Sequence, residues 1–557
     1  MKRNKLIKYA FLLAFPIAGS LLVSSCTDGF ENMNTSGIEV DPNDLPFAAQ
    51  FQEPMTYCYP PHQNMFQFWT NLSIDFYGGY FMTPNGNFTN GDYGENRGHS
   101  GGMFENYYLH IFNNTRRIIS KCEEDGYLGI AGMMRIVQAY GTLMTTDTYG
   151  PLAYKSVLEG NNVSFYYDKQ EDIYKAVLAD LDKGIEGLKS LSAGSIEEGI
   201  IKVADNWCGG NAATWLKIAN TLKLRMAMRM VKVADMAGIN VKQIAEAAVQ
   251  DGVLTDADQD ILINKNLENE LWLMFAWGDC GFNANLVTMM TGFNDPRLPL
   301  YMTKNTGEIK VGEKVVVAKD SEYLGIRIGS GLPGKPNPWG NFSGWLPASS
   351  YTMPLPIMKV AEAYFLRAEG ALRGWNMGGS AQSLYEEGVK VSFSNELKYR
   401  GLYAGVTSYP DGAVDAYLNG TTGQSDFNDP VDAKNSIKAL NTIGVKWDEG
   451  ATKEEKLQRI ITQKWLALFP LSNEAWAEYR RTGYPKLFPV RVNESNGAVS
   501  SEEQIRRSIY SSIAYDTNEA ELLKGIQLLD QENSSTQFKG DIGGTRVWWD
   551  RADKGNF

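Results

Sequence analysis

The chain has 557 residues, 43% of them hydrophobic, which is enough to bury a large core. Its formal net charge of -12 argues against a protein that binds nucleic-acid phosphates, and no dense run of Lys and Arg interrupted by aromatic residues occurs. With only His62, His99 and His110 present, a metal centre built from several histidines is disfavoured.

The first 25 residues have the pattern of a signal peptide. A basic start, Lys2 to Lys8, precedes a hydrophobic run from Tyr9 to Val23, which is short for a membrane span. The run ends in Val23-Ser-Ser-Cys26, which resembles a bacterial lipobox, where the cysteine is lipidated and becomes the new N-terminus. Asp28 and Glu31 follow, similar to the surface-export signal of Bacteroidetes lipoproteins. The alternative is a plain secretory signal with an unrelated cysteine.

We therefore expect residues 1–25 to be removed, Cys26 to be lipidated and residues 26–46 to form a polar tether. Because the removed segment holds four basic residues and no acid, the mature chain would carry a charge of -16. No later stretch is hydrophobic for long enough to cross a bilayer, so the sequence predicts an anchored protein that does not span the membrane. The remaining cysteines are expected to be isolated thiols, with a disulfide left open: Cys58, Cys122, Cys208 and Cys280.

Hydrophobic residues at helical spacing predict helices over much of the next 200 residues. An aromatic-rich helix is expected from Met65 to Tyr80, followed by a loop over residues 83–102, where glycine and asparagine favour turns. Further helices are expected over residues 103–122, 127–148, 169–190, 211–234 and 240–250.

Between residues 256 and 352 the helical signal largely disappears. Two short stretches look like strands, Lys314–Ala318 and Tyr323–Ile328, and residues 329–340 form a loop rich in glycine and proline. A second irregular stretch covers residues 399–450. Both are expected to be loop-rich insertions in a single domain, residues 47–557, whose helical scaffold covers residues 47–255, 353–398 and 451–557.

Two helices joined by a short turn are expected around residues 364–371 and 381–388. Small residues at Ala368, Ala371 and Ala381 would let the two helices approach closely, a feature similar to the tetratricopeptide repeat. The repeat period is irregular elsewhere. The sequence thus favours a mainly α fold made of paired helices, with long irregular loop insertions and a few short strands.

The segment Gln463–Pro485 concentrates aromatic residues at helical spacing and would anchor a large core. Trp465 lies on the apolar face of a helix that Pro470 should end, because proline lacks the amide donor and its ring clashes with the preceding turn. A second helix is expected to begin near Asn473, whose side chain would cap it, and to stop at Gly483.

This segment resembles one in the SusD/RagB family of outer-membrane nutrient-binding lipoproteins, in its SusD-like branch. Thr146–Tyr154, Ala361–Glu369 and Asp295–Leu298 are similar to further segments of that family, in the same order along the chain. The resemblance implies a tetratricopeptide-like scaffold, ligand binding without catalysis, and a SusC-like TonB-dependent transporter as partner. It also implies an outer-membrane location facing the cell exterior, but it does not specify the ligand.

Other motifs point to no enzyme. Gly329–Gly334 spells G-x-G-x-x-G, but the prolines that follow forbid the helix that a dinucleotide site requires. Asp256–Asp260 alternates acids as a calcium loop does, yet Ile261 stands where the loop needs glycine and Leu267 where it needs glutamate. No cofactor is expected; a lone structural calcium and a pair of glycosidase carboxylates stay open.

Aromatic residues inside the glycine-rich loops are the strongest candidates for ligand binding. A sugar ring has an apolar face that packs on an aromatic ring and a polar rim that bonds to Asn, Asp or Arg. The competing interpretation is that these rings only pin the loops to the scaffold. The candidate residues form three clusters: Phe88, Tyr93, Asn96 and Arg97; Trp272, Trp277, Asp279 and Phe282; and Trp339, Phe342 and Trp345.

The leading hypothesis is a cell-surface lipoprotein that captures oligosaccharides and passes them to a SusC-like transporter. One alternative keeps the fold and changes the ligand to oligopeptides, which would rely more on backbone hydrogen bonds and apolar pockets. Another is a structural lid with no ligand of its own. An enzyme is disfavoured because no catalytic constellation stands out in the sequence.

Overall fold

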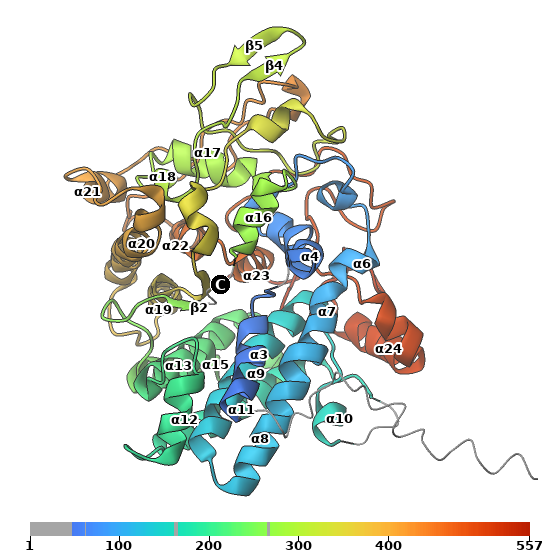
Figure 1. The fold of residues 1–557 in the computed structure, drawn as a ribbon, viewed down its shortest axis with the longest axis vertical. Helices are drawn as coiled ribbons and strands as arrows, with labels where there is room; N and C mark the ends of the chain where they lie inside the picture. The colour runs from blue at the N-terminus through green and yellow to red at the C-terminus, as the bar shows by residue number, and fades with distance from the viewer. Residues whose placement is uncertain (1–46, 62, 161–164, 264–267) are drawn as a thin grey trace, which may run out of the picture. The chain divides into compact units, whose positions relative to one another are not determined.

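The computed structural model describes residues 47–61, 63–160, 165–263 and 268–557, and residues 51–557 form one compact unit (Figure 1). The expected signal peptide, the tether and Cys26 lie outside the described residues. No helix in the described part of the chain is both long and apolar enough to cross a membrane.

Paired helices build the first half of the unit, around the long helix α9 (Leu128–Tyr149). This helix is buried on nearly every side because it packs against both α8 (Asn113–Asp125) and α11 (Gln170–Lys189). Glycine makes the second contact possible, since a Cβ atom on Gly132 would lie 2.5 Å from the carbonyl oxygen of Gly184. The close approach of helices through small residues is the packing that the sequence predicts.

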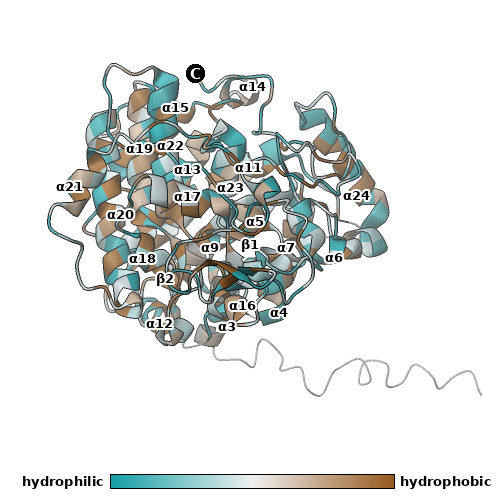
Figure 2. Cartoon of the chain, turned by 90° about the horizontal axis from the view of Figure 1, so that it is seen from above, coloured by the Kyte–Doolittle hydropathy of each residue, from teal (hydrophilic) through white to brown (hydrophobic). Residues whose placement is uncertain are grey.

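The second half repeats this arrangement with α19 (Val360–Leu372), α20 (Ala381–Ala404) and α22 (Lys453–Leu468). A Cβ atom on Gly388 would lie 3.1 Å from the ring of Phe365, so this glycine lets α20 lie close to α19. In Figure 2, helices at the edge of the unit such as α15 and α24 carry both hydrophilic and hydrophobic stretches, as expected for helices with one face toward solvent.

The other α-helices are mostly short. They are α3 (Phe47–Tyr57), α4 (Gln63–Phe66), α5 (Ile74–Tyr77), α6 (Arg97–Ser100), α7 (Gly102–Asn106), α10 (Lys155–Leu158), α12 (Ile196–Ala204), α13 (Ala212–Arg229), α14 (Ala234–Ala237), α15 (Val241–Asp251), α16 (Glu270–Ala276), α17 (Ala284–Gly292), α18 (Leu298–Tyr301), α21 (Ala413–Leu418), α23 (Ser472–Thr482) and α24 (Ser512–Glu532). The π- and 3₁₀-helices are η2 (Gln67–Asn71), η3 (Thr89–Asp92), η4 (Tyr107–Phe112), η5 (Pro338–Asn341), η6 (Ala348–Thr352) and η7 (Ala433–Asn435).

Strands occur only as short antiparallel pairs in the described residues. β1 (Phe81–Met82) pairs with β3 (Gly281–Phe282), and β2 (Ile261–Ile263) pairs with β6 (Leu355–Met358). β4 (Ile309–Val311) and β5 (Lys314–Val317) form a hairpin that projects at the top of Figure 1. The first two pairs connect the loop-rich insertion, residues 256–352, to segments outside it: β3 to β1 before the insertion, and β2 to β6 after it.

The predicted fold class is confirmed: the chain is mainly helical, with paired helices and a few short strands. The strand expected at Lys314–Ala318 is β5. The strand expected at Tyr323–Ile328 is wrong, because Ile326 makes only one bridge, to Asn283. That stretch has no neighbouring strand with which it could form a ladder, so its alternating pattern does not produce one.

The irregular stretches hold more helix than the sequence suggests. Residues 256–352 contain α16, α17 and α18, and the stretch over residues 399–450 begins inside α20 and contains α21. Helix α17 is buried along most of its length, so its sequence shows no contrast between an apolar and a polar face. A short apolar run of this kind cannot be identified as helix from its pattern alone.

The segment Gln463–Pro485 forms α22 and α23, which are separated at Pro470 as expected. The predicted cap is wrong, because the residue before α23 is Leu471 and no side chain caps the helix there. Asn473 instead donates from Nδ2 to Oγ1 of Thr148 on α9, 3.0 Å away. Its polarity serves packing between helices, which a local sequence pattern cannot show.

A buried ionic network joins α13, α19, α22 and α23. Glu474 accepts hydrogen bonds from Nη2 of Arg229 at 2.6 Å and from Nζ of Lys464 at 3.3 Å. Burial alone would raise the pKa of Glu474, but Arg229, Arg225 and Lys464 bring it below its ordinary value. Further ion pairs of the network are Arg225–Glu362, Arg481–Glu369 and Arg481–Glu478.

The last part of the described chain also belongs to the core. Val547, Trp549 and Asp550 are fully buried, and Nε1 of Trp549 donates to Oδ1 of Asp147 on α9, 2.7 Å away. Arg506 pairs with Asp550 at 2.6 Å. The final tryptophans therefore fill space beside the central helix.

Candidate ligand-binding site

The third predicted cluster meets Trp272 of the second at one pocket of about 240 Å³. The other members of the second cluster, Trp277, Asp279 and Phe282, are not part of its lining. One wall comes from α16 and the residues after it, and the other from η5 and the loop that follows. The loop that carries the first predicted cluster, residues 83–102, contributes only Pro84. The aromatic residues that line the pocket are Trp272, Phe275, Trp339, Phe342 and Trp345.

Trp345 is fixed at the base of the pocket by rings on several sides. It stacks on Phe282 with ring centroids 6.0 Å apart and an interplanar angle of 11°, and it lies 5.4 Å from Phe275. The guanidinium carbon of Arg400 lies 5.3 Å from its ring centroid, in a cation–π contact. Only 6% of Trp345 is exposed, so most of its surface is packing surface.

Trp339 is held by the second insertion. Its Nε1 donates to Oδ2 of Asp429, 3.0 Å away, and Oδ1 of Asn337 accepts the Trp339 backbone amide at 3.1 Å. Asp429 also accepts from Asn435 Nδ2 at 2.8 Å, so its carboxylate is well satisfied. Trp339 is 8% exposed and lines the pocket, while Phe342, also in the lining, is 3% exposed.

The most accessible rings are on and just after α16. Asn269 caps this helix by accepting the amide of Trp272, which sets the direction in which the Trp272 ring leaves the helix. Trp272 is half-buried and packs edge-on against Tyr351, with centroids 4.9 Å apart. Trp277 is 36% exposed, the largest exposed fraction of any tryptophan in the described residues. Trp272 lines the pocket, whereas Trp277 lies outside its lining.

An ion pair joins the two loops beside the pocket. Lys335 Nζ lies 2.6 Å from Oδ1 of Asp279 and donates to the carbonyl oxygen of Trp277 at 2.8 Å. Asp279 also accepts from Asn85 Nδ2 at 3.0 Å and from Gln67 Nε2 at 3.2 Å. The Asp279 carboxylate, which was predicted to bind a ligand, is therefore already bonded to three donors. These bonds connect the loop after α16 to the loops that carry Asn85 and Lys335.

The first predicted cluster does not join the pocket. Tyr93 is 1% exposed and packs beside Tyr77, 6.5 Å between centroids. Asn96 caps α6, and Arg97 pairs with Asp541 at 2.5 Å. Phe88 is half-buried, with its ring edge toward His99.

The arrangement of the pocket favours binding over catalysis. The half-buried rings of Trp272 and Phe275 line it with the more deeply buried Trp339, Phe342 and Trp345, and Ser343 and Thr306 lie beside them. Sequence reasoning missed the roles of Lys335, Asn85 and Asp429. Each acts on a residue far away in the sequence, so no local pattern could have indicated it.

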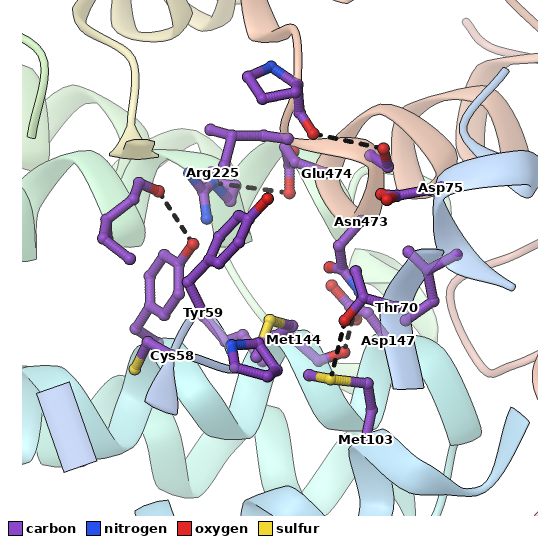
Figure 3. Close-up of a pocket in the computed structure, with 18 of the residues that line it drawn as sticks. Cys58, Tyr59, Thr70, Asp75, Met103, Met144, Asp147, Arg225, Asn473 and Glu474 are labelled. Carbon is purple, nitrogen blue, oxygen red and sulfur yellow. Dashed lines mark hydrogen bonds and ion pairs between the residues drawn. The ribbon is translucent and has the colours of Figure 1, made fainter. Parts of the chain in front are cut away.

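A second, internal cavity of about 60 Å³ lies below the loops, between α9, α13 and α23 (Figure 3). Asp75, Asp147, Arg225 and Glu474 line it together with methionine side chains. A cavity of this size, enclosed in the core, has room for a few water molecules and not for a sugar ring. We assign it to the buried ionic network.

Burial raises the pKa of Asp75 to about 6, although Ser472 and Asn71 donate hydrogen bonds that oppose the rise. Ionisation of this carboxyl therefore costs stability as the pH rises from about 4 to 6, where the unfolded chain is already ionised. We expect Asp75→Asn to raise the free energy of unfolding by about 1–3 kcal/mol near pH 7.5 and to change it little near pH 4.

Denaturant unfolding of the variant at both pH values checks this prediction. Asp125→Asn at an exposed helix end is the control and should show no such pH difference. An equal effect of Asp75→Asn at the two pH values would contradict it.

The acids that resembled a calcium loop have other partners. Asp256 accepts the hydroxyl of Tyr364 at 2.9 Å, Asp258 pairs with Lys217 at 2.9 Å, and Asp260 pairs with Lys359 at 3.1 Å. No cluster of three metal-binding side chains occurs in the part of the chain that the structure describes. The four described cysteines are free thiols, and burial raises the pKa of each.

Comparison with known proteins gives consistent results. The family model described as SusD-like, Susd and RagB outer membrane lipoprotein, matches residues 32–550. No curated protein matches the chain.

Among solved structures, a chitin-binding SusD homologue from Flavobacterium johnsoniae is 34% identical, with a TM-score of 0.80 over 92% of this chain and 100% of that one. A SusD homologue from Bacteroides vulgatus is 30% identical, with a TM-score of 0.79 over 92% of this chain and 98% of that one. A SusD homologue from Bacteroides ovatus is 33% identical, with a TM-score of 0.76 over 90% of this chain and 98% of that one. The match over nearly the whole described chain shows that the protein belongs to the SusD/RagB family.

Proposed function

We propose that this protein is a cell-surface glycan-binding lipoprotein that captures oligosaccharides and passes them to a SusC-like TonB-dependent transporter. The observation that carries the proposal is the pocket where the third aromatic cluster meets Trp272. A family relative of similar fold binds chitin, which supports a saccharide as the ligand.

The chemistry of the pocket suits a sugar. Trp272 offers a half-buried ring for the apolar face of a pyranose, and the exposed ring of Trp277 stands outside the pocket lining on the loop that the Lys335–Asp279 pair holds. The Trp272 ring packs against Tyr351 on a capped helix, so little entropy is lost on binding. Of the polysaccharides, β-linked acetylated hexosamine oligomers are our first candidate because of the chitin-binding relative.

The remaining parts of the proposal follow from the family and the N-terminus. Lipidation at Cys26 would hold the domain on the outer membrane, facing the exterior, with residues 26–46 as tether. The transporter would be the partner of the whole single domain, residues 47–557. We propose binding without catalysis, since the pocket lining holds no carboxylate, and the two acids beside it, Asp279 and Asp429, are both engaged by hydrogen-bond donors.

Isothermal titration tests the ligand. We expect the folded protein to bind chitin oligosaccharides, and the panel should include cellulose and starch oligosaccharides and short peptides. Binding of peptides alone would favour the oligopeptide alternative. Binding of none of them would overturn the proposal and leave the structural-lid alternative, in which pocket mutations leave uptake unchanged.

A further inference from the structure

A further pocket, of about 340 Å³, lies in the loops around α21. It is distinct from both the aromatic pocket and the internal cavity. It is lined by Gly420, Thr421, Gly444, Lys446, Trp447, Asp448 and Arg459. In Figures 1 and 2, α21 stands at the side of the unit opposite α24. No residue is shared with the proposed glycan site, so this pocket needs its own explanation.

The loops that form this pocket are held in a defined conformation. The backbone amide of Lys446 donates to the carbonyl oxygen of Gly420 at 2.8 Å, which joins the two loops. A Cβ atom on Gly444 would lie 2.5 Å from the carbonyl carbon of Thr421, so only glycine allows this approach. On the α22 side, Trp447 is 8% exposed and its Nε1 donates to Glu449 at 2.7 Å.

Arg459 of α22 is the unusual group. Its Nε and Nη1 atoms are buried and have no hydrogen-bond partner, and no carboxylate of the described residues pairs with its guanidinium. A buried guanidinium N–H without an acceptor lowers the stability of the fold, because its hydrogen bonds to water are lost and no protein hydrogen bond replaces them. Lys446, at the same pocket, is exposed and is likewise without a carboxylate partner in the part of the chain that the structure describes.

The acids nearby are already engaged. Asp448 accepts the amide of Gly450 at 2.9 Å, and Glu449 pairs with Lys456 at 3.2 Å. Glu455 closes the capping box of α22 with Thr452. Asp448 also lines the pocket, and Arg459 is near enough to Glu455 to help the hydrogen bonds from Thr452 lower the pKa of that carboxyl. Neither acid forms an ion pair with Arg459 or Lys446 among the described residues, which leaves both cations available to an anion.

We propose that this pocket binds the carboxylate of a small ligand, with Arg459 and Lys446 as its partners. A guanidinium matches a planar carboxylate in geometry, and a lysine adds a point charge at the mouth. The carboxylate could come from an acidic sugar unit or from the free C-terminus of a short peptide, and the volume suits one or two such units.

Titration with digalacturonate, galactobiose, N-acetyl-dialanine, N-acetyl-dialanine amide and sodium sulfate tests this proposal. We expect at least one carboxylate probe to bind, its neutral counterpart not to bind, and the affinity to fall with added salt. Digalacturonate and N-acetyl-dialanine separate the sugar source from the peptide source. Failure of both carboxylate probes, equal binding of the neutral probes, or binding of sulfate alone would overturn it.

The variants locate the site. Arg459→Gln should lower the affinity for the carboxylate probe about tenfold or more, as expected for loss of a charge-assisted hydrogen bond. Arg116→Gln is the matched control, because the Nε of Arg116 also lacks a partner but the residue lies on α8, outside the pocket, and it should bind as the wild type does. Wild-type affinity in Arg459→Gln would contradict the assignment. Neither variant should change the binding of a neutral oligosaccharide, so the glycan proposal is tested separately.

Discussion

Glu474→Ala is expected to lower the free energy of unfolding by about 3–5 kcal/mol, because it leaves buried cations without their counter-ion. Glu474 bonds to Arg229 and Lys464, and Arg225 lies 3.6 Å from the same carboxylate. These side chains are almost fully buried, so water cannot replace the lost carboxylate. Unfolding followed by circular dichroism in denaturant, with the midpoint and slope compared, measures the change.

The pH dependence gives a second readout. Because the cations lower the pKa of Glu474 below its ordinary value, its stabilising effect is present above about pH 4.5 and is lost as the pH falls toward the folded-state pKa. The deficit of Glu474→Ala should therefore shrink in acid. Glu387→Ala, at an exposed site on α20, is the control and should stay within about 0.5 kcal/mol of the wild type. Equal losses in the two variants would disprove the importance of the network.

Trp272→Ala is expected to weaken oligosaccharide binding about tenfold or more and to leave the fold intact. Stacking of a sugar on this half-buried ring would contribute about 1.5–3 kcal/mol, and the truncated residue would also lose its contact with Tyr351. Titration of the variant with the oligosaccharide that the wild type binds measures the loss, and thermal unfolding shows whether the fold is retained.

The control for this experiment is Trp375→Ala. Trp375 is also half-buried but lies after α19, outside the pocket, so the same chemical change should leave the affinity unaltered. If both variants bind as the wild type does, the ligand does not use this pocket, and the structural-lid alternative gains support.

The fold was predictable to a large extent because the long helices carry strong periodic patterns. Helices α9, α11, α13 and α15 lie within a few residues of their expected bounds. The short helices α16 and α18 were not foreseen, since seven and four residues are too few to show a period. The π-helix η4 was expected as ordinary α-helix, because the same spacing fits both.

The site was predictable only in part. The loop positions predicted for Trp272 and Trp339 indicated a role outside the helical core, and both line the pocket, although Trp272 stands on the short helix α16. Tyr93 has the same surroundings in sequence, yet its hydroxyl reaches Gln504, 411 residues away, and the ring is buried. Whether a loop ring faces ligand or scaffold depends on which distant segment covers it, and one sequence holds no record of that.

The buried charged residues of the core could not be predicted from the sequence for the same reason. Glu474 and Arg481 lie on helical positions that would ordinarily face water, and both are buried. Their partners Arg229 and Glu369 come from other helices, 245 and 112 residues away. An amphipathic pattern treats each charge alone, so it cannot foresee that four helices bury their charges against one another.

The burial of Val547–Asp550 beside α9 has a consequence for biogenesis. Until these residues have emerged from the ribosome or the translocation channel, Asp147 has no indole donor and Arg506 has no carboxylate. A growing chain can form its early helix pairs, but the space beside the central helix stays open to water. Completion of the tertiary structure beside α9 is thereby delayed until residues 547–550 have been delivered.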